Sequence, residues 1–349
     1  MRAVRVPMEN PHRTATGVIT ESPLVLIDAI TDEGIVGHGI VFTYTVAALR
    51  PVAEFVTNIE HLVKGEPLAP VAITDKLAGR FRLLGTQGLV GMALAGIDMA
   101  LWDALARVHG SSLAALLGCV ETPIRAYGAV GHDGAVGSAH TAEEWAKRGF
   151  LGVKAKIGYS DLKEDVQVVR AIRQAVGCDM AIMVDYNQCL TPAEAVPRIR
   201  AIEEFGITWA EEPTLAHDFE GHAFIARELE TPIQCGENWW GPLDMRNAIL
   251  AKASDFVMPE VMKMGGVTGW RRAVAIAEVH GIRVSTHLWS EISAQLLSST
   301  PMAHWLEYSD WWNPILAEPL VVQHGFSVPS ASFGSGVSWN EHAVDKFLA

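Results

Sequence analysis

The chain of 349 residues is 49% hydrophobic, which is enough for a large barrel domain together with a smaller one. Its formal net charge of −13, from 27 basic and 40 acidic residues, argues against nucleic acid as a partner, because phosphate binding requires a basic surface. The four cysteines form no C-x-x-C pair, and scattered thiols of this kind indicate a reduced, cytoplasmic setting.

The first 120 residues are predicted to form an α+β domain. They open with "MRAVRVPMEN", which has no apolar core of signal-peptide length. Residues 22–42 are typical of two antiparallel strands joined at Asp32-Glu33-Gly34. Residues 46–118 are predicted to be mostly helical, with Ala, Leu and Met at helical spacing. No stretch of the chain reaches about 18 uninterrupted apolar residues, so we expect no membrane-spanning helix.

Residues 121–309 are predicted to form a (β/α)-barrel, because short apolar runs alternate with amphipathic segments. One of the helices is expected over 191–206, with Thr191 as its N-cap and Gly206 at its far end. The remaining residues, 310–349, return to short strands that we expect to pack on the first domain. Eight barrel strands are expected, at 124–130, 153–158, 180–187, 207–214, 232–237, 255–261, 283–288 and 304–308.

Three carboxylates recur at the ends of successive predicted strands. Asp185, Glu211 and Glu237 follow one another at intervals of 26 residues, and the chemistry of such barrels lies at those strand ends. Converging carboxylates repel each other unless a cation lies among them, and an all-oxygen set suits Mg²⁺. A lone acid at a strand end is more often a helix cap or an ion-pair partner, but three at matched positions favour a metal site. The spacing selects Glu211 rather than Glu212, which alternation turns the other way.

Two lysines lie on one face of the strand "VKAKIG", one strand upstream. Lys154 and Lys156 would repel each other there, and lysine is rarely buried without a partner. An ion-paired edge is the structural explanation. The functional one is that one lysine neutralises a substrate carboxylate, while the other becomes a general base. A neighbouring cation and partial burial both lower a lysine pKa toward that role.

His287 ends a later strand, and Glu260 ends the strand before it. A single histidine in a strand is often a satisfied core residue. Here a carboxylate hydrogen-bonded to the imidazole would orient the ring and raise its basicity. Glu307, in "HWLEY", could donate a hydrogen bond to an oxyanion only if a dry environment keeps it protonated.

These residues together resemble the enolase superfamily and, within it, the mandelate racemase subgroup. The resemblance covers nearly the whole chain, through "GIDMALWDAL", "VKAKIGY", "IMVDYNQ", "EEPTLAHDFEGH", "GENWWGP", "MPEVMKMGGVTGW", "STHLWSEISA" and "AHWLE". It implies an enolase-type modified TIM barrel with an N-terminal α+β capping domain. It also implies Mg²⁺ held by Asp185, Glu211 and Glu237, and removal of the proton alpha to a carboxylate to give an enediolate.

The resemblance further implies a role for each remaining polar group. Lys156 would be the base on one face of the substrate carbon and His287 the base on the other. Lys154 would bind the substrate carboxylate, with Glu307 on its other oxygen, and Asn187 would approach the alpha-hydroxyl. The partner would be a small 2-hydroxycarboxylate, and relatives are commonly dimers or octamers. Members usually open with a longer first strand, so we expect the natural start to lie upstream of Met1.

Two departures from the family pattern concern the acid–base pair and the pocket. The partner of His287 is normally an aspartate, so Glu260 either requires an adjusted barrel or alters the His287 half-reaction. In the loop that caps the pocket, His12 and Thr16 replace small apolar groups, while Tyr44 is retained, and we expect His12 and Tyr44 to contact the substrate. A serine near the carboxylate is replaced by Ala129. Such a pocket, with Arg13 nearby, favours a more polar 2-hydroxy acid, such as an acid sugar.

The sequence therefore supports a Mg²⁺-dependent racemase of 2-hydroxycarboxylates as the leading hypothesis. The first alternative is an acid-sugar dehydratase on the same site, in which His287 protonates a departing 3-hydroxyl group. A Schiff-base aldolase using Lys156 covalently, and a binding scaffold without activity, are further alternatives.

Overall fold

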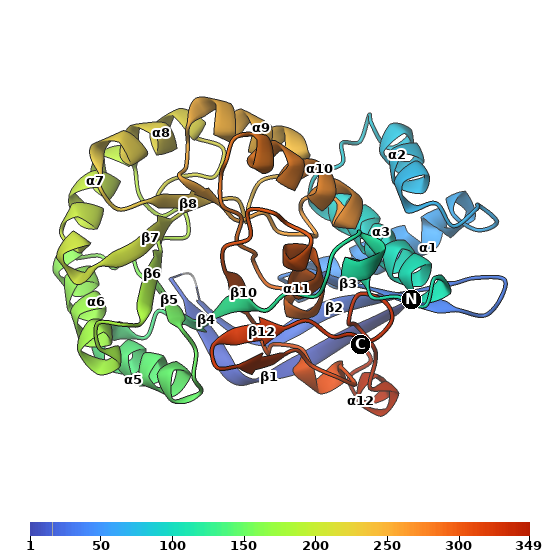
Figure 1. The fold of residues 1–349 in the computed structure, drawn as a ribbon, viewed down its shortest axis with the longest axis horizontal. Coiled ribbons are helices and arrows are strands. Elements are labelled where there is room, and N and C mark those ends of the chain that lie inside the picture. Colours follow the sequence, from blue (N-terminus) through green and yellow to red (C-terminus); the bar gives the residue numbers. More distant parts are fainter. Residues whose placement is uncertain (16) are drawn as a thin grey trace.

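The computed structural model describes residues 1–15 and 17–349, which form two sheets with helices packed around them (Figure 1). The first sheet is antiparallel, in the order β1-β2-β3, and the hairpin expected at Asp32-Glu33-Gly34 is confirmed between its second and third strands. Gly34 has a φ of 80°, a left-handed conformation that glycine adopts without steric cost. The strands are β1 (Arg2–Thr14), β2 (Gly17–Ile30) and β3 (Val36–Phe42).

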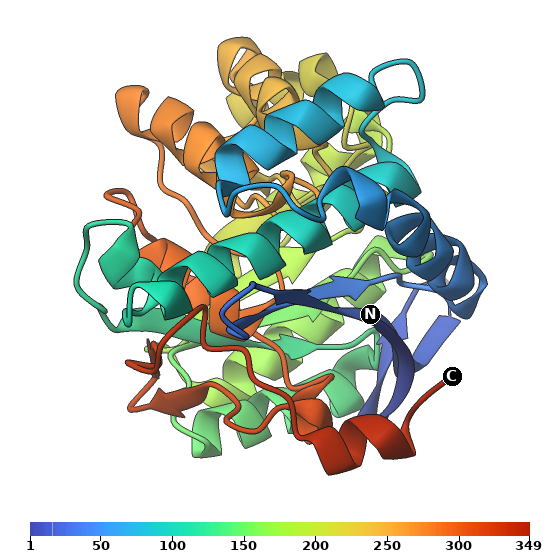
Figure 2. The same cartoon turned by 90° about the vertical axis from the view of Figure 1, so that its right-hand side faces the viewer.

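The predicted helical region follows this sheet. Its helices are α1 (Val46–Ile59), α2 (Pro70–Arg80), α3 (Gly88–Val108) and α4 (Leu113–Leu116), with a 3₁₀ turn at Glu60–Leu62. Figure 2 shows the long α3 lying between the first sheet and the helices α2 and α10 (Gly266–Val279). By length and composition α3 could cross a membrane, but 83% of its apolar window is buried inside the fold, as in the core helix of a globular domain.

The second sheet forms the wall of a barrel. Its parallel strands are neighbours in the order of the chain, from β4 to β9, and β10 pairs back with β4. Seven of the eight expected strands are present: β4 (Ile124–Val130), β5 (Gly152–Lys156), β6 (Ala181–Asp185), β7 (Ile207–Glu211), β8 (Ile233–Cys235), β9 (Phe256–Val257) and β10 (Leu306–Tyr308).

The expected strand at 283–288 is wrong as a regular strand. Only Val284 makes ladder bridges, to Val257 on one side and Ala303 on the other. At the end of this segment, Leu288 and Trp289 have left-handed φ values of 50° and 47°, which turn the chain directly into the next helix. Backbone hydrogen bonds from this segment still close the barrel wall between β9 and β10.

Helices cover the outside of the barrel and follow an arc around the strands in Figure 1. The capping box at Thr191 is present, but the helix predicted over 191–206 ends at Arg200, after which the chain tightens into a 3₁₀ turn at Glu203–Phe205. Besides α10, these helices are α5 (Gly134–Lys147), α6 (Leu162–Val176), α7 (Pro192–Arg200), α8 (Phe219–Glu228), α9 (Gly241–Ala251) and α11 (Ser290–Ser298).

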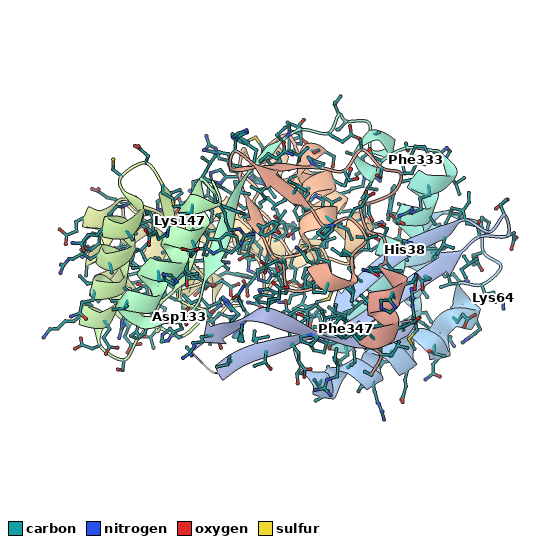
Figure 3. The ribbon with its side chains drawn as sticks, turned by 90° about the horizontal axis from the view of Figure 1, so that it is seen from below. His38, Lys64, Asp133, Lys147, Phe333 and Phe347 are labelled. Atoms are coloured by element: carbon teal, nitrogen blue, oxygen red, sulfur yellow. The ribbon has the colours of Figure 1, made fainter. Side chains whose placement is uncertain are left out.

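The C-terminal residues contact both parts of the molecule. The helix α12 (Glu341–Lys346) leads to backbone hydrogen bonds with β1, from Arg5 N to Phe347 O and from Ala349 N to Ala3 O, and Figure 3 shows Phe347 beside that sheet. The strands β11 (Val321–Gln323) and β12 (Phe326–Val328), after a 3₁₀ turn at Asn313–Ile315, instead extend the barrel sheet. The reason is that β10 pairs only with residues 126–128, which leaves the start of β4 free for β12. The domain division at 120 and 309 stays a prediction.

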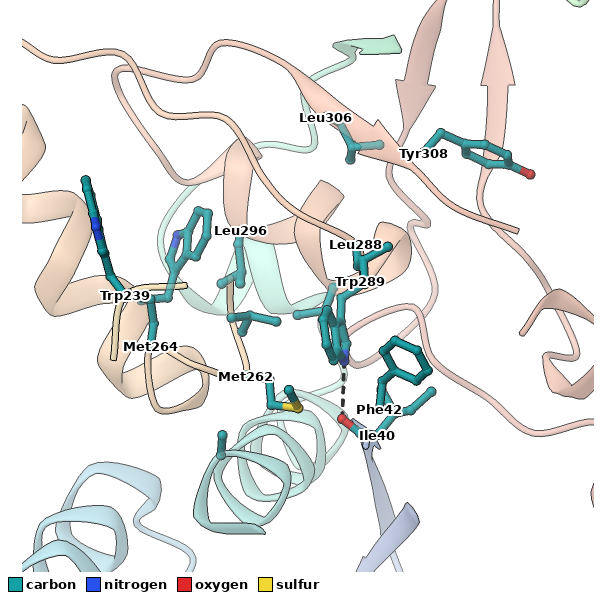
Figure 4. Close-up of a cluster of buried hydrophobic side chains, with 14 of the residues drawn as sticks. Ile40, Phe42, Trp239, Met262, Met264, Leu288, Trp289, Leu296, Leu306 and Tyr308 are labelled. Atoms are coloured by element: carbon teal, nitrogen blue, oxygen red, sulfur yellow. Dashed lines mark hydrogen bonds between the residues drawn. The ribbon is translucent and has the colours of Figure 1, made fainter. Parts of the chain in front are cut away.

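A largely apolar interface holds the first sheet and α3 against the barrel. In Figure 4, Trp289 packs among buried side chains and donates from Nε1 to the backbone oxygen of Ile40 at 3.2 Å. Asp98 on α3 accepts hydrogen bonds from the backbone N–H and the hydroxyl of Thr268 on α10, and burial raises the pKa of this carboxyl group to about 6. These two polar side chains of the interface are therefore paired, as burial requires.

The closeness of β3 and α3 gives a stability prediction. A Cβ atom on Gly39 would lie 2.2 Å from the backbone oxygen of Gly96 and 2.9 Å from the backbone nitrogen of Ala100. Gly39→Ala should therefore lower the free energy of unfolding by at least about 1–3 kcal/mol, measured from the urea midpoint. Gly79→Ala is the matched control: it lies in α2 with open space around it and should stabilise by about 0.5–1 kcal/mol. An unchanged midpoint for Gly39→Ala would contradict the close contact.

Candidate active site

The register of the barrel strands brings the predicted site residues together. Lys156 on β5 is the direct partner of Asp185 on β6, and Asp185 is the partner of Glu211 on β7. All three side chains thus leave the sheet at the same level, at the carboxyl ends of parallel strands. Glu237 follows β8 by two residues and completes the row.

The three carboxylates form a compact buried cluster. Each of Asp185, Glu211 and Glu237 offers an oxygen atom, and these atoms lie within 4.8 Å of one another. Oε2 of Glu237 is buried and accepts no hydrogen bond from the described residues, although Nε2 of His287 lies 3.1 Å away. An orphaned buried carboxylate oxygen in an all-oxygen cluster fits a divalent cation such as Mg²⁺.

The electrostatics of this cluster reflect crowded negative charge. Burial and the neighbouring carboxylates raise the pKa of Glu211 well above its usual range, against the attraction of Lys154. The pKa of Glu237 is lowered instead, because His287 and three lysines outweigh the effect of burial. Asp185 is fixed by the backbone N–H of Asn187, which donates to its Oδ1 at 2.7 Å from a left-handed conformation.

Glu212 differs from its expected outward position. It is fully buried, and burial followed by repulsion from Glu237 raises its pKa to about 8. Its backbone has a φ of 36°, which breaks the alternation on which that expectation rested. Asn238 donates from Nδ2 to Oε2 of Glu212 at 2.7 Å.

Both lysines are ion-paired. Nζ of Lys154 lies 2.6 Å from Oε1 of Glu211 and 3.0 Å from Oε1 of Glu307. Nζ of Lys156 lies 2.9 Å from Oδ2 of Asp185 and donates to Oδ1 of Asn187 at 2.7 Å. Burial lowers the pKa of each lysine, but the carboxylates outweigh burial and raise both pKa values. The sequence led us to expect a lowered lysine pKa caused by a cation, and the protein's own groups act in the opposite direction.

Glu260 reaches His287 in spite of its extra methylene group. Oε2 of Glu260 lies 2.6 Å from Nδ1 of His287, so the barrel accommodates the longer side chain. The Tyr44 hydroxyl donates to the same oxygen at 2.6 Å. Nε2 of His287 is left to face Glu237 and, at 3.7 Å, Oε2 of Glu307. Burial lowers the pKa of His287, but these carboxylates together raise it above its usual value.

A small cavity lies beside these groups. His12 forms part of its wall, with its ring packed against Trp311, and burial together with Lys156 and Lys154 lowers the pKa of His12 to about 3. Arg13, expected nearby, points away and pairs with Asp133 at 3.4 Å, and Thr16 lies outside the described residues. The cavity is lined by His12, Ala129, Val130, Lys154, Lys156, His287, Leu288, Glu307, Tyr308, Ser309 and Trp311.

Two polar residues that the sequence analysis did not single out complete the arrangement. Asn238 bridges Glu212 and Glu237, and Lys263 donates to Oδ1 of Asn238 at 2.8 Å. Tyr44 donates to Glu260 and is not among the residues that line the cavity, and its contact with substrate stays a prediction. Lys263 could have been identified from the sequence, because it stands three residues after Glu260 in "MPEVMKMGG".

Comparisons with known proteins agree with this architecture. Residues 1–118 match the N-terminal domain of the mandelate racemase / muconate lactonizing enzyme family, and residues 137–343 match the enolase C-terminal domain-like family.

Individual relatives cover most of the chain. An L-talarate/galactarate dehydratase of Salmonella typhimurium is 30% identical over 93% of this chain and 82% of its own length. An L-Ala-D/L-Glu epimerase of Bacillus subtilis is 28% identical over 80% of this chain and 76% of its own. The crystal structure of an enolase from Bradyrhizobium, complexed with magnesium and mandelic acid, is 43% identical and superposes with a TM-score of 0.94, covering 100% of this chain and 96% of that one.

The enzymes among these relatives comprise racemases, epimerases, cycloisomerases and dehydratases, and magnesium is bound in several of the similar structures. The buried triad of Asp185, Glu211 and Glu237 suits the same ion. The chain therefore belongs to the mandelate racemase / muconate lactonizing enzyme family of the enolase superfamily, and it is a magnesium-dependent enzyme of this group.

Proposed function

We propose that this enzyme racemises a 2-hydroxycarboxylate by removing the proton alpha to the carboxylate. The observation that carries the proposal is that two candidate bases, Lys156 and His287, line the same cavity from different parts of the barrel. Each has its own carboxylate partner, Asp185 for the lysine and Glu260 for the histidine. A racemase needs one base on each face of the reacting carbon, since the proton leaves one face and returns on the other.

The residues of the chain have distinct tasks in this reaction. Asp185, Glu211 and Glu237 would hold Mg²⁺, which supplies Lewis-acid stabilisation of the enediolate when bound. Lys156, as the neutral amine, takes the proton from one face, and the imidazolium of His287 returns a proton to the other. With the opposite enantiomer as substrate, His287 removes the alpha proton and Lys156 returns one. The hydrogen bond between Glu260 and Nδ1 keeps Nε2 of His287 as the reacting atom.

Substrate binding falls to the polar groups around Lys154. Its ammonium group would hold the substrate carboxylate, with Glu307 at the second oxygen and Asn187 near the alpha-hydroxyl group. Donors that already face the developing charge lower the barrier without reorganising. Lys154 and Lys156 are the only lysine or arginine side chains among the described residues that line the cavity, and both already have a role, so a second carboxylate on the substrate would find no cation of its own.

The rest of the cavity wall indicates the kind of substituent on the alpha carbon. Val130, Leu288 and Trp311 are apolar, and His12 is neutral. This wall favours a compact, largely apolar substituent over a second acid group. The 43% identical Bradyrhizobium enzyme, whose structure contains mandelic acid, supports the same choice. The more polar acid sugar that the sequence suggested therefore becomes the second candidate.

That second candidate is dehydration of an acid sugar. One relative of 30% identity, an L-talarate/galactarate dehydratase, favours this function. In addition, the pair of His287 and Glu260 could protonate a departing 3-hydroxyl group. Incubation with a library of sugar acids separates the two functions: a 2-keto-3-deoxy product indicates dehydration, whereas inversion without that product indicates racemisation. The comparisons give no support to a Schiff-base aldolase or to a binding scaffold.

The remaining properties are proposed on the family resemblance and the composition. We propose a homo-oligomer, a dimer or an octamer, that works in the cytoplasm on a small-molecule acid. Binding to nucleic acid or to a membrane is not expected, given the net charge of −13.

Removing magnesium should abolish activity. Chelation by EDTA should stop exchange of the alpha proton in D₂O, followed by NMR, and added Mg²⁺ should restore it. Glu211→Gln should lower the exchange rate by more than about 100-fold, since even outer partners of a metal ligand are worth about 10–100-fold. Glu33→Gln, on the exposed turn before β3, is the control. Full activity in EDTA would exclude a metal-dependent reaction.

Each base should serve one enantiomer. Lys156→Gln should slow alpha-proton exchange of one enantiomer by about 10²–10⁴-fold and spare the other, and His287→Asn should do the reverse. Both variants should lose racemisation, because each direction needs a proton from the opposite face. Lys163→Gln, exposed at the start of α6, should behave like the parent. If both variants lost exchange of both enantiomers equally, the two-base assignment would be wrong.

Shortening Glu260 should slow only the proton exchange that depends on His287. Glu260→Asp withdraws the carboxylate by about 1.5 Å, one C–C bond, and so breaks the 2.6 Å contact with Nδ1. A displacement of about 1 Å can cost about 100-fold in rate, so His287-dependent exchange should fall by that order while Lys156-dependent exchange is kept. The exposed Glu278→Asp is the control. Faster His287-dependent exchange would mean that the longer side chain is a hindrance.

A further inference from the structure

We propose that Lys263 is a positioning residue that fixes Glu260 and, through it, His287. This inference rests on the proposed two-base racemase and adds the residue on which one of its two half-reactions depends. Lys263 is not among the residues that line the cavity, so it acts on the reaction only through other side chains.

The surroundings of Lys263 tie its charge to Glu260. Its side chain is 6% exposed, and Nζ lies 3.7 Å from Oε2 of Glu260, the ion pair that the described residues give it. Nζ also lies 4.7 Å from the centre of the Tyr44 ring, whose hydroxyl holds the same carboxylate oxygen. A lysine is seldom buried without such a partner, because an uncompensated buried charge is strongly unfavourable.

Glu260 needs a permanent cation. The residue is fully buried, its Oε1 has no hydrogen-bond partner among the described residues, and its contacts converge on Oε2. Among the described residues, the ion-pair partners of Glu260 are His287 at 2.6 Å and Lys263 at 3.7 Å, and Lys263 is the one of the two that takes no part in the proposed proton transfer.

Lys263 also links Glu260 to the loop that carries a metal ligand. Its ammonium group donates to Oδ1 of Asn238, which turns Nδ2 of that amide toward Glu212 and Glu237. Its backbone oxygen accepts a hydrogen bond from Gly241 N at 3.0 Å, which joins the turn after β9 to the start of α9. Lys263 therefore contacts both the carboxylate that holds His287 and the amide that donates to Glu237.

The test measures alpha-proton exchange in D₂O for each enantiomer separately. Lys263→Met keeps the apolar stem and removes the charge, and Lys263→Gln keeps a donor for Asn238. Both should slow His287-dependent exchange by about 10–100-fold, the range for partners one layer behind a reacting group. Lys156-dependent exchange should stay within about 2-fold for both variants, which also shows that they fold, and the Mg²⁺ dissociation constant should stay within about 2-fold for Lys263→Gln, which keeps the donor to Asn238. Lys163→Met is the matched surface control.

A double-mutant cycle decides whether Lys263 acts through Glu260. In a Glu260→Gln background, Lys263→Met should have no further effect on His287-dependent exchange, because the two substitutions remove one interaction. An additive effect, an equal loss for both enantiomers, or no effect of Lys263→Met would overturn the proposal. If the parent enzyme exchanges neither alpha proton of any 2-hydroxy acid, the proposed function itself has failed instead.

Discussion

Repulsion among buried carboxylates is the constraint on which this site depends. Asp185, Glu211 and Glu237 converge within 4.8 Å, and further acids lie behind them. Such a cluster is stable only with cations close by. The chain supplies lysines on two sides, Lys154 from β5 and Lys263 from the turn after β9, and magnesium supplies the rest. The position of each basic group therefore follows from the acids that it must balance.

The barrel meets this constraint through simple register. Because Lys156, Asp185 and Glu211 are direct partners on adjacent parallel strands, no loop has to be folded in a special way to bring them together. Where regular strand ends, the backbone adopts left-handed conformations at Asn187, Glu212 and Leu288. Such conformations cost free energy in residues other than glycine, and here they aim polar groups at the site.

The sequence was sufficient for what periodicity and spacing encode. The 26-residue interval predicted the acidic triad, and the alternation of strands with helices predicted the barrel. The sequence was insufficient for features of the structure that depend on a single backbone angle. The burial of Glu212 goes with a left-handed φ at that residue, and the expected strand at 283–288 is reduced to ladder bridges at Val284. The contact between Glu260 and His287 could not be predicted either, because it depends on a hydrogen bond from Tyr44, which is distant in the chain.

The first sheet contributes to the wall of the cavity and to the support of His287. His12 on β1 forms its wall, while Tyr44, just after β3, supports the histidine partner. Selectivity and acid–base chemistry are therefore coupled through one small sheet. An engineer who exchanges this sheet for that of a relative, in order to change substrate preference, also exchanges a support of the catalytic histidine. Grafts that retain Tyr44, and the segment around it, would separate these two properties.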